Sequence, residues 1–326
     1  MIDKETDGLL QGTIAHLCKV SLATVNRYIT SKNYKPIDRS IHRNQRYSIS
    51  DSRKIVTHLM AKNKRSILKK KFAFYNFKGG TGKTSLCFQI ATHMALIGYN
   101  VLVIDADPQG HLSTSCGFPN DDSFLTLYDF LIRKVPFSEI KRNICEGLDC
   151  IPSNLSLTRL EMELNQLPKR EERFLIELAE VEKNYDFIFI DTNPTISLLN
   201  RNVIVFSDVI NIICETQPYS LNGLKLLIED LNRFYSHMSM PLCELNIIPN
   251  KYEDRTSSSA EAMTALREYY RSYIKEDYAV RRSEDINTAA KLGKPLAFFA
   301  KKNSIALADI IELLQYFLEK YTMKII

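Results

Sequence analysis

The sequence predicts an α/β protein whose larger part is a doubly wound, mostly parallel sheet, preceded by a small α-helical module. Beyond residue 70, short apolar runs alternate with helical segments, and the first run enters a glycine-rich turn. Near-continuous apolar strands separated by amphipathic helices are typical of a parallel sheet covered on both faces. At 326 residues the chain is long enough for one small and one large domain.

Composition indicates a folded protein without a disulfide or zinc framework. The chain is 45% hydrophobic and 25% charged, as in ordinary globular domains. Its seven cysteines are an odd number and include no Cys-x-x-Cys pair. The N-terminus shows no basic region followed by an apolar run, and no apolar stretch reaches the roughly 18 residues that span a bilayer. We therefore expect a cytoplasmic protein with no membrane partner.

Positive charge is concentrated at the start of the chain. The first 71 residues hold 16 Lys and Arg against 5 Asp and Glu, whereas the remainder holds 27 against 33. A small basic module is typical of proteins that bind the phosphate backbone of DNA, and a solvated basic surface is the alternative. Charge alone does not decide between them.

Residues 11–30 predict two short helices joined by a tight turn, because apolar side chains fall on one face of each. The pattern resembles a helix-turn-helix, with Lys19 where that family usually has Gly. In such a motif the second helix enters the major groove by its N-terminal residues. The side chains expected to contact bases or phosphates are therefore those of Thr24, Asn26 and Arg27.

The stretch HRNQRYSISDSRKI resembles the wing and following helix of MerR-like winged modules, with Arg46 and Tyr47 at the end of the wing. Residues 1–61 are accordingly predicted to be a winged helix-turn-helix domain in which Arg46 contacts DNA. An ordinary helical cap is the alternative. The basic run over 62–71 predicts a linker or short helix, and residues 72–326 form the α/β domain.

The stretch FAFYNFKGGTGKTSLCFQIA joins an apolar strand, a glycine-rich turn and the start of a helix. Such a turn lets backbone amides curl around phosphates, and the helix presents its unpaired N–H groups to the same anion. Lys83 would neutralise the β and γ phosphates of a nucleotide, and the Thr84 hydroxyl would bind Mg²⁺. The predicted nucleotide-binding residues here are Gly79, Gly80, Thr81, Gly82, Lys83, Thr84 and Ser85.

The string KGGTGKTS is the deviant Walker A motif, and the chain resembles the ParA and MinD superfamily, in particular the ParA ATPases that partition plasmids. The resemblance runs through nearly the whole larger domain. It implies that Lys78, a second, signature lysine, reaches across an ATP-bound homodimer to the partner's phosphates and takes part in catalysis. A solvated loop lysine is the alternative.

Two further strand ends resemble nucleotide motifs of that family. In VLVIDADPQG, the resemblance implies that Asp107 lies near Mg²⁺ and the attacking water and serves hydrolysis, while Asp105 supports the loop. In FIFIDTNP, Asp191 would hold a Mg²⁺-bound water from the strand terminus, as a Walker B carboxylate does. The family usually continues with a small residue and prolines, where this chain has Asn193.

Three other positions align with functional residues of relatives. Asn250 resembles the Asn that reads adenine, with a turn Asn as the alternative. Arg255 and Arg281 align with arginines that hold DNA without sequence preference, and a plain surface role is the alternative. After the second arginine the chain has EDIN in place of the family's EAPS.

The resemblance implies a DNA-segregation ATPase that uses ATP and Mg²⁺, yields ADP, binds nucleoid DNA as a dimer and responds to a centromere-binding ParB-type partner. The N-terminal module would bind the operator. Three alternatives stay open: a MinD-like positioning ATPase, an ATP-sensing repressor and an iron–sulfur carrier using Cys116. The predicted C-terminal helix argues against membrane cycling, because its apolar face should pack on the sheet through Ile310, Leu313, Leu314, Phe317 and Tyr321.

Overall fold

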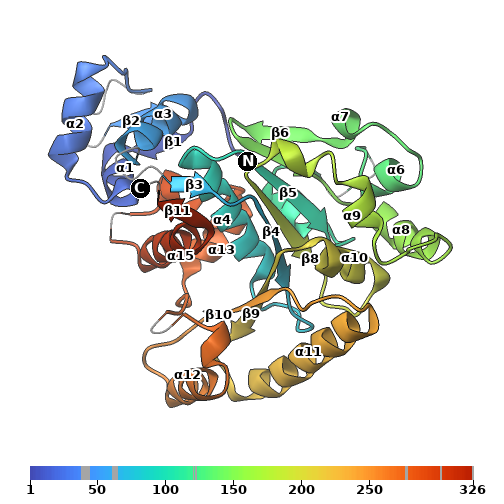
Figure 1. The fold of residues 1–326 in the computed structure, drawn as a ribbon. Coiled ribbons are helices and arrows are strands. Elements are labelled where there is room, and N and C mark those ends of the chain that lie inside the picture. The colour runs from blue at the N-terminus through green and yellow to red at the C-terminus, as the bar shows by residue number, and fades with distance from the viewer. Residues whose placement is uncertain are drawn as a thin grey trace.

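A seven-stranded sheet forms the centre of the chain, of which this computed structural model describes residues 1–37, 45–60, 65–119, 121, 123–275, 278–301 and 303–324. Its order is β10-β9-β4-β8-β5-β7-β6 (Figure 1). Strand β6 is antiparallel to β7, and every other neighbouring pair is parallel. The strands are β4 (Lys70–Tyr75), β5 (Val101–Ala106), β6 (Arg142–Cys145), β7 (Leu148–Ile151), β8 (Phe187–Thr192), β9 (Val209–Glu215) and β10 (Glu244–Asn250).

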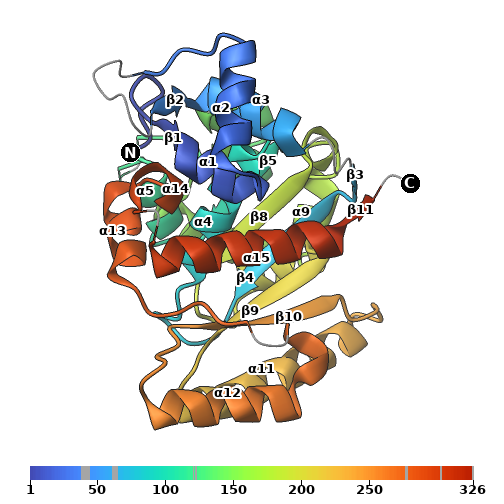
Figure 2. The same ribbon diagram turned by 90° about the vertical axis from the view of Figure 1, so that its left-hand side faces the viewer.

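Helices cover both faces of this sheet, which confirms the predicted α/β class. On one face lie α4 (Lys83–Leu96) and α15 (Ile305–Tyr321), and on the other lie α8 (Ser156–Leu164), α10 (Leu198–Phe206) and α11 (Pro218–His237). Figure 2 shows α15 crossing the sheet beside α4, with α11 and α12 (Ser257–Tyr269) on the far side of β9 and β10.

The alternation of side chains along β4 explains how one strand serves both faces. Phe72 and Phe74 join the core under α4 and α15, whereas Ala73 and Tyr75 join the core on the opposite face. The ring of Phe72 lies 5.0 Å from that of Phe317 on α15. The predicted C-terminal helix and its buried face are therefore confirmed.

The other elements of the larger part are short. They are α5 (His111–Ser115), α6 (Leu127–Leu131), α7 (Phe137–Ile140), α9 (Arg173–Glu177), α13 (Glu284–Leu292), α14 (Leu296–Phe299) and the 3₁₀ turns Glu182–Asn184 and Arg271–Tyr273. No helix in these described ranges is both long and apolar enough to cross a membrane.

The described residues of the N-terminal module form a two-stranded sheet and three helices: β1 (Gly8–Leu10), α1 (Gln11–Cys18), α2 (Leu22–Ser31), β2 (Arg46–Ser48) and α3 (Ile49–Met60). Helices α1 and α2 form where the apolar pattern predicts them. The turn between them places Lys19 at φ 53°, in the left-handed region that favours glycine. This conformation explains why helix-turn-helix motifs usually have Gly at this position. Residues 38–44, which include the first part of the predicted wing, lie outside the described residues.

The module packs against the larger domain through α3. The Arg53 guanidinium donates hydrogen bonds to the carbonyls of Ala95, Gly98 and Tyr99, at the C-terminal end of α4. Lys294, just after α13, pairs with Asp7 at 2.8 Å. Buried residues of both parts belong to one continuous hydrophobic cluster.

The prediction of a linker or short helix over 62–71 is wrong for the described part of that segment. Arg65–Ile67 is a strand, β3, which pairs antiparallel with β11 (Thr322–Lys324), and β4 already begins at Lys70. The basic composition hid this strand because its partner lies at the other end of the chain.

We predict that His93, in the middle of α4, makes stability depend on pH. The side chain is fully buried, and burial lowers its pKa to about 4, although a hydrogen bond with the Gln89 carbonyl opposes this. The native state keeps the ring neutral, so stability is retained above the unfolded-state pKa of about 6.5 and falls as pH drops toward 4. Between pH 7 and pH 5 this linkage amounts to about 2 kcal/mol.

Urea unfolding at the two pH values checks this expectation. Between pH 7 and pH 5, the free energy of unfolding of His93→Leu should fall by about 2 kcal/mol less than that of the wild type. His16→Leu, on the exposed side of α1, is the control and should keep the wild-type slope. Equal pH dependence of His93→Leu and wild type would contradict the prediction.

Candidate functional site

The glycine-rich turn lies between β4 and α4 and has the backbone that a phosphate loop needs. Gly80 and Gly82 adopt φ angles of 74° and 96°. Gly82 is the N-cap of α4 and supplies no side chain, so the first N–H groups of the helix face the turn. A Cβ on Gly82 would lie 2.3 Å from the amide nitrogen of Asn250, so glycine is required there for two reasons.

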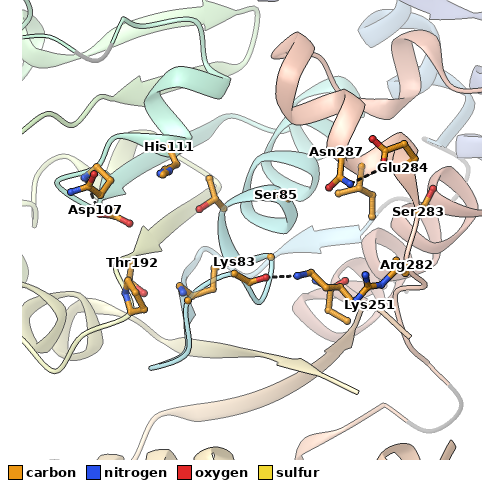
Figure 3. A pocket seen from close by; sticks show the side chains of 18 of the residues that line it. Lys83, Ser85, Asp107, His111, Thr192, Lys251, Arg282, Ser283, Glu284 and Asn287 are labelled. Carbon is orange, nitrogen blue, oxygen red and sulfur yellow. Dashed lines mark hydrogen bonds between the residues drawn. The ribbon is translucent and has the colours of Figure 1, made fainter. Parts of the chain in front are cut away.

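A cavity of about 740 Å³ opens over this turn. Figure 3 shows Asp107 and His111 on one side of it, Lys83 and Thr192 at its floor, and Ser283, Glu284 and Asn287 on the other side. The cavity therefore joins the phosphate loop, the end of β5 and the start of α13. It is lined by Gly79, Gly80, Gly82, Lys83, Thr84, Ser85, Asp107, Gln109, His111, Thr192, Pro194, Asn250, Lys251, Arg281, Arg282, Ser283, Glu284, Ile286 and Asn287.

Lys83, Thr84 and Asp191 meet at the first turn of α4. The Thr84 hydroxyl donates to Asp191 Oδ2 at 2.6 Å, and Lys83 Nζ lies 3.4 Å from the Lys78 carbonyl. Burial lowers the pKa of Lys83, whereas burial and the neighbouring Asp105 raise the pKa of Asp191 well above its usual value. Asp191 Oδ1 is buried and has no hydrogen-bond partner among the described residues.

This arrangement fits a magnesium ion bound together with a nucleotide. An unpaired buried carboxylate oxygen beside a threonine hydroxyl offers hard oxygen ligands, which Mg²⁺ prefers. Within the described ranges, no three His, Cys, Asp or Glu side chains gather to hold a metal by themselves. Mg²⁺ needs few protein ligands, since phosphate oxygens and waters complete its shell.

Asp105 and Asp107 take different positions at the end of β5. Asp105 is fully buried, and burial raises its pKa to about 6 although hydrogen bonds from Ser113 and Asp107 oppose the shift. Its Oδ1 accepts the amide of Asp107 at 3.1 Å. Asp107 lines the cavity, and its Oδ1 accepts the amide of Gln109 at 2.9 Å. Asp107 therefore faces the ligand space, and Asp105 holds the loop from behind.

Lys78 is paired within its own chain. Its ammonium lies 2.5 Å from Glu215 Oε2, at the end of β9, and about half of the side chain is exposed. Lys251 Nζ approaches the other oxygen of Glu215 at 2.8 Å and also donates to the Gly80 carbonyl. Burial alone would raise the pKa of Glu215, but the two lysines outweigh it and lower the pKa.

Asn250 lies at the phosphate loop. Its amide nitrogen donates to the Thr81 carbonyl at 2.7 Å, and the side chain is buried. The structure thus gives this residue a contact that holds the loop. Reading of adenine stays a prediction for its oxygen.

The sequence analysis did not predict the cavity wall from Ser283 to Asn287, and it predicted Arg281 beside that wall only as a DNA contact. Ser283 caps α13 by accepting the amide of Asp285, so Glu284 and Asn287 on the first turn of that helix line the cavity. The cap followed by two acidic residues is a helix-start signal, but nothing local indicates that the helix begins at a ligand site. Lys251 was missed for the same reason.

The predicted DNA contacts fall into two groups. Thr24, Asn26 and Arg27 on α2 are exposed, as is Arg255 before α12. Other predicted contacts are already bonded within the chain. Arg281 forms a two-pronged pair with the buried Asp309 on α15, and Arg46 donates to the Gly8 carbonyl at 2.6 Å.

Comparison with known proteins identifies the family. A family model described as an AAA domain matches residues 69–243, more than half of the chain. The chain is 33% identical to the cell division protein PomZ of Myxococcus xanthus over 238 residues, which cover 73% of this chain and 74% of PomZ. It is 30% identical to the chromosome partitioning protein ParA of Caulobacter vibrioides, over 71% of this chain and 87% of that protein. The chain belongs to the ParA family of P-loop ATPases.

Another relative of this ParA-family ATPase is the sporulation initiation inhibitor protein Soj of Bacillus subtilis, 30% identical over 70% of this chain and 90% of Soj. Solved structures agree in fold. An ATP complex of McdA from Cyanothece has a TM-score of 0.69 at 21% identity, covering 78% of this chain and 98% of McdA. A plasmid partition protein from Borrelia burgdorferi bound to AMPPNP has a TM-score of 0.63 at 23% identity, covering 77% of this chain and 99% of that chain.

We predict that Gly82→Ala weakens binding of an ATP analogue by at least about tenfold. The left-handed backbone at Gly82 costs an alanine roughly 1–2 kcal/mol, and about 1.4 kcal/mol is a factor of ten in affinity. In addition, the new methyl group would displace Asn250. Titration of a fluorescent nucleotide measures the loss.

Gly223→Ala is the matched control, because a Cβ on this glycine of α11 meets open space. Its nucleotide affinity should equal that of the wild type. Unchanged affinity of Gly82→Ala would show that the ligand does not depend on this turn.

Proposed function

We propose that this ParA-family ATPase is a Mg²⁺-dependent ATPase that partitions DNA, with the plasmid as the replicon class favoured by its sequence. The observation that carries the proposal is the pair of lysines on one phosphate loop: Lys83 buried in the cradle and Lys78 half-exposed at its rim. A single buried lysine suffices to neutralise the phosphates of a bound nucleotide. A second one at the rim suits a contact with another subunit.

ATP and Mg²⁺ fit the cavity by the chemistry of its walls. The amides of the glycine turn and Lys83 would hold the phosphates, and Thr84 with Asp191 would hold the cation. The cation would neutralise charge on the β and γ phosphates. Asp107, on the cavity wall opposite α13, would orient the attacking water. The Cyanothece McdA structure was solved with ATP, and this chain resembles it in fold.

The proposed cycle begins with closure of a homodimer on ATP. Lys78 would then leave Glu215 and reach the phosphates held by the other subunit. The closed dimer would bind nucleoid DNA without sequence preference, using the exposed Arg255. A centromere-bound ParB-type partner would stimulate hydrolysis and so release the DNA, in the cytoplasm.

The N-terminal module supplies the second proposed DNA contact. Thr24, Asn26 and Arg27 share the exposed side of α2, while Val25 and Ile29 are buried against the rest of the module. We infer that α2 reads an operator and that the protein regulates its own operon through it. Arg46, held at β1, would position this surface.

Lys78→Ala should lose the increase in DNA binding that a slowly hydrolysed ATP analogue produces, because the closed dimer would lack its cross-subunit contact. Binding of a random-sequence duplex is measured for wild type and variant with ADP and with the analogue, at one fixed salt concentration. Lys225→Ala, a largely exposed lysine of α11, serves as control and should behave as wild type. If the wild type binds the duplex equally well with ADP and with the analogue, the result would indicate instead a repressor that acts through residues 1–61.

Arg27→Ala should weaken the DNA binding that persists with ADP and lower the salt slope of log K by about 1, as expected for one lost phosphate contact. The triphosphate-dependent binding should persist. Arg233→Ala, exposed on α11, removes a similar charge from the other part of the molecule and should leave the ADP-state slope unchanged. If both variants bind alike with ADP, α2 does not contact DNA.

The similarity to PomZ makes cell-division positioning a second candidate function. The DNA-binding measurements do not distinguish the two candidates by themselves, so genetics separates them. Loss of the gene should destabilise its replicon if the protein partitions DNA, and should misplace division sites if it positions the division machinery. Membrane cycling has less support, because the apolar face of α15 is buried against the sheet.

A further inference from the structure

A closed ring of hydrogen bonds lies directly beneath Asp107 and links the ends of β5 and β7. The hydroxyl of Ser153, which follows β7, donates to the Asp107 carbonyl at 2.6 Å. The amide of Ser153 donates to the Ser113 hydroxyl at 2.7 Å. Ser113 in turn donates to Asp105 Oδ2 through its hydroxyl at 2.7 Å and its amide at 2.8 Å. Asp105 Oδ1 closes the ring by accepting the Asp107 amide.

Within the ring, Ser153 donates through its hydroxyl and its amide, Asp105 accepts through both carboxylate oxygens, and the Ser113 hydroxyl both donates and accepts. Ser113 and Ser153 are buried, as is Asp105, so water does not replace a missing partner without a rearrangement. The directions are consistent: the Ser113 hydroxyl gives its proton to Asp105 and therefore accepts from Ser153. The Asp107 amide is thus held by Asp105 at the end of its own strand, and the Asp107 carbonyl, which also accepts the Gly110 amide at 2.9 Å, is held by Ser153 after β7.

We propose that Ser153 and Ser113 are positioning residues that fix the backbone of Asp107 for hydrolysis. Neither serine lines the cavity. Ser153 acts through the Asp107 carbonyl, and Ser113 acts through Asp105, which accepts the Asp107 amide. A group that orients water must be held within a fraction of an ångström of its working position, and such precision comes from supporting hydrogen bonds. The inference rests on the proposed role of Asp107 and deepens it.

Steady-state ATPase kinetics of the full-length protein without DNA, together with nucleotide affinity, test the proposal. Ser153→Ala should lower kcat about tenfold, the size expected for one lost hydrogen bond at a supporting position, and leave the dissociation constant for ATP within about twofold. Ser113→Ala should behave alike. Because the ring acts as a unit, the double variant should remain near tenfold and not reach hundredfold.

Ser207→Ala is the matched control: Ser207 is a buried serine whose hydroxyl donates to the Val203 carbonyl at 2.7 Å, far from the cavity. It should keep the wild-type kcat. Equal kcat of Ser153→Ala and Ser207→Ala would overturn the proposal. Losses that simply multiply in the double variant, or an ATP affinity that falls together with kcat, would overturn it as well.

Hydrogen exchange of the nucleotide-free protein gives a readout that does not depend on turnover. The peptide over residues 105–115 should exchange several-fold faster in Ser153→Ala than in wild type or Ser207→Ala, because the loop loses its tie to β7. Unchanged exchange there would count against the ring as the support of Asp107. Neither measurement uses DNA, so a failure of DNA partition as the function is seen separately in the DNA-binding experiment.

Discussion

Two buried carboxylates on neighbouring strands determine the electrostatics of the whole site. Asp105 on β5 and Asp191 on β8 are paired in register, and both are fully buried. Burial and the neighbouring Asp105 raise the pKa of Asp191, and burial raises the pKa of Asp105. Lys83, the Thr84 hydroxyl and the two donors of Ser113 offset part of the negative charge of the two carboxylates. Asp191 Oδ1 has no hydrogen-bond partner among the described residues. The fold thus creates a need for positive charge at the carboxyl ends of the central strands, which a magnesium ion bound together with the nucleotide would supply.

Helix α4 connects the nucleotide site to the N-terminal module. Its first turn holds Lys83 and Thr84, and its middle is buried between the sheet and α15. In its last turn the Ala95 carbonyl accepts a hydrogen bond from Arg53 of the N-terminal module, which also bonds the carbonyls of Gly98 and Tyr99 just beyond the helix. A guanidinium at a helix C-terminus satisfies carbonyls that have no partner within the helix and complements the dipole. The same helix therefore presents its positive end to the phosphates and its negative end to the module predicted to bind DNA.

The sequence predicted the site residues that belong to local motifs and did not predict contacts between segments far apart in the chain. Lys83 and Asp191 were predicted because one begins a helix after a glycine-rich turn and the other ends an apolar strand, and parallel strands bring those ends together. The role of Asp107 was implied by the resemblance of its motif to that of the family. The pairing of Arg281 with Asp309, the wall from Ser283 to Asn287 and the ring through Ser153 depend on contacts between distant segments that no spacing records. Strand β3 escaped for the same reason, since its partner is β11.

The position of Glu215 would allow Lys78 to be held in one subunit and still be released to another. Removing one partner from a buried ion pair is costly when it leaves a charge unpaired in a poorly solvated place. Glu215 is nearly buried but has two lysines, one on each oxygen. If Lys78 leaves for another subunit, Lys251 keeps the carboxylate paired and keeps its own bond to the Gly80 carbonyl. The phosphate loop would then stay in place while the half-exposed lysine moves, which is the property a signature lysine needs.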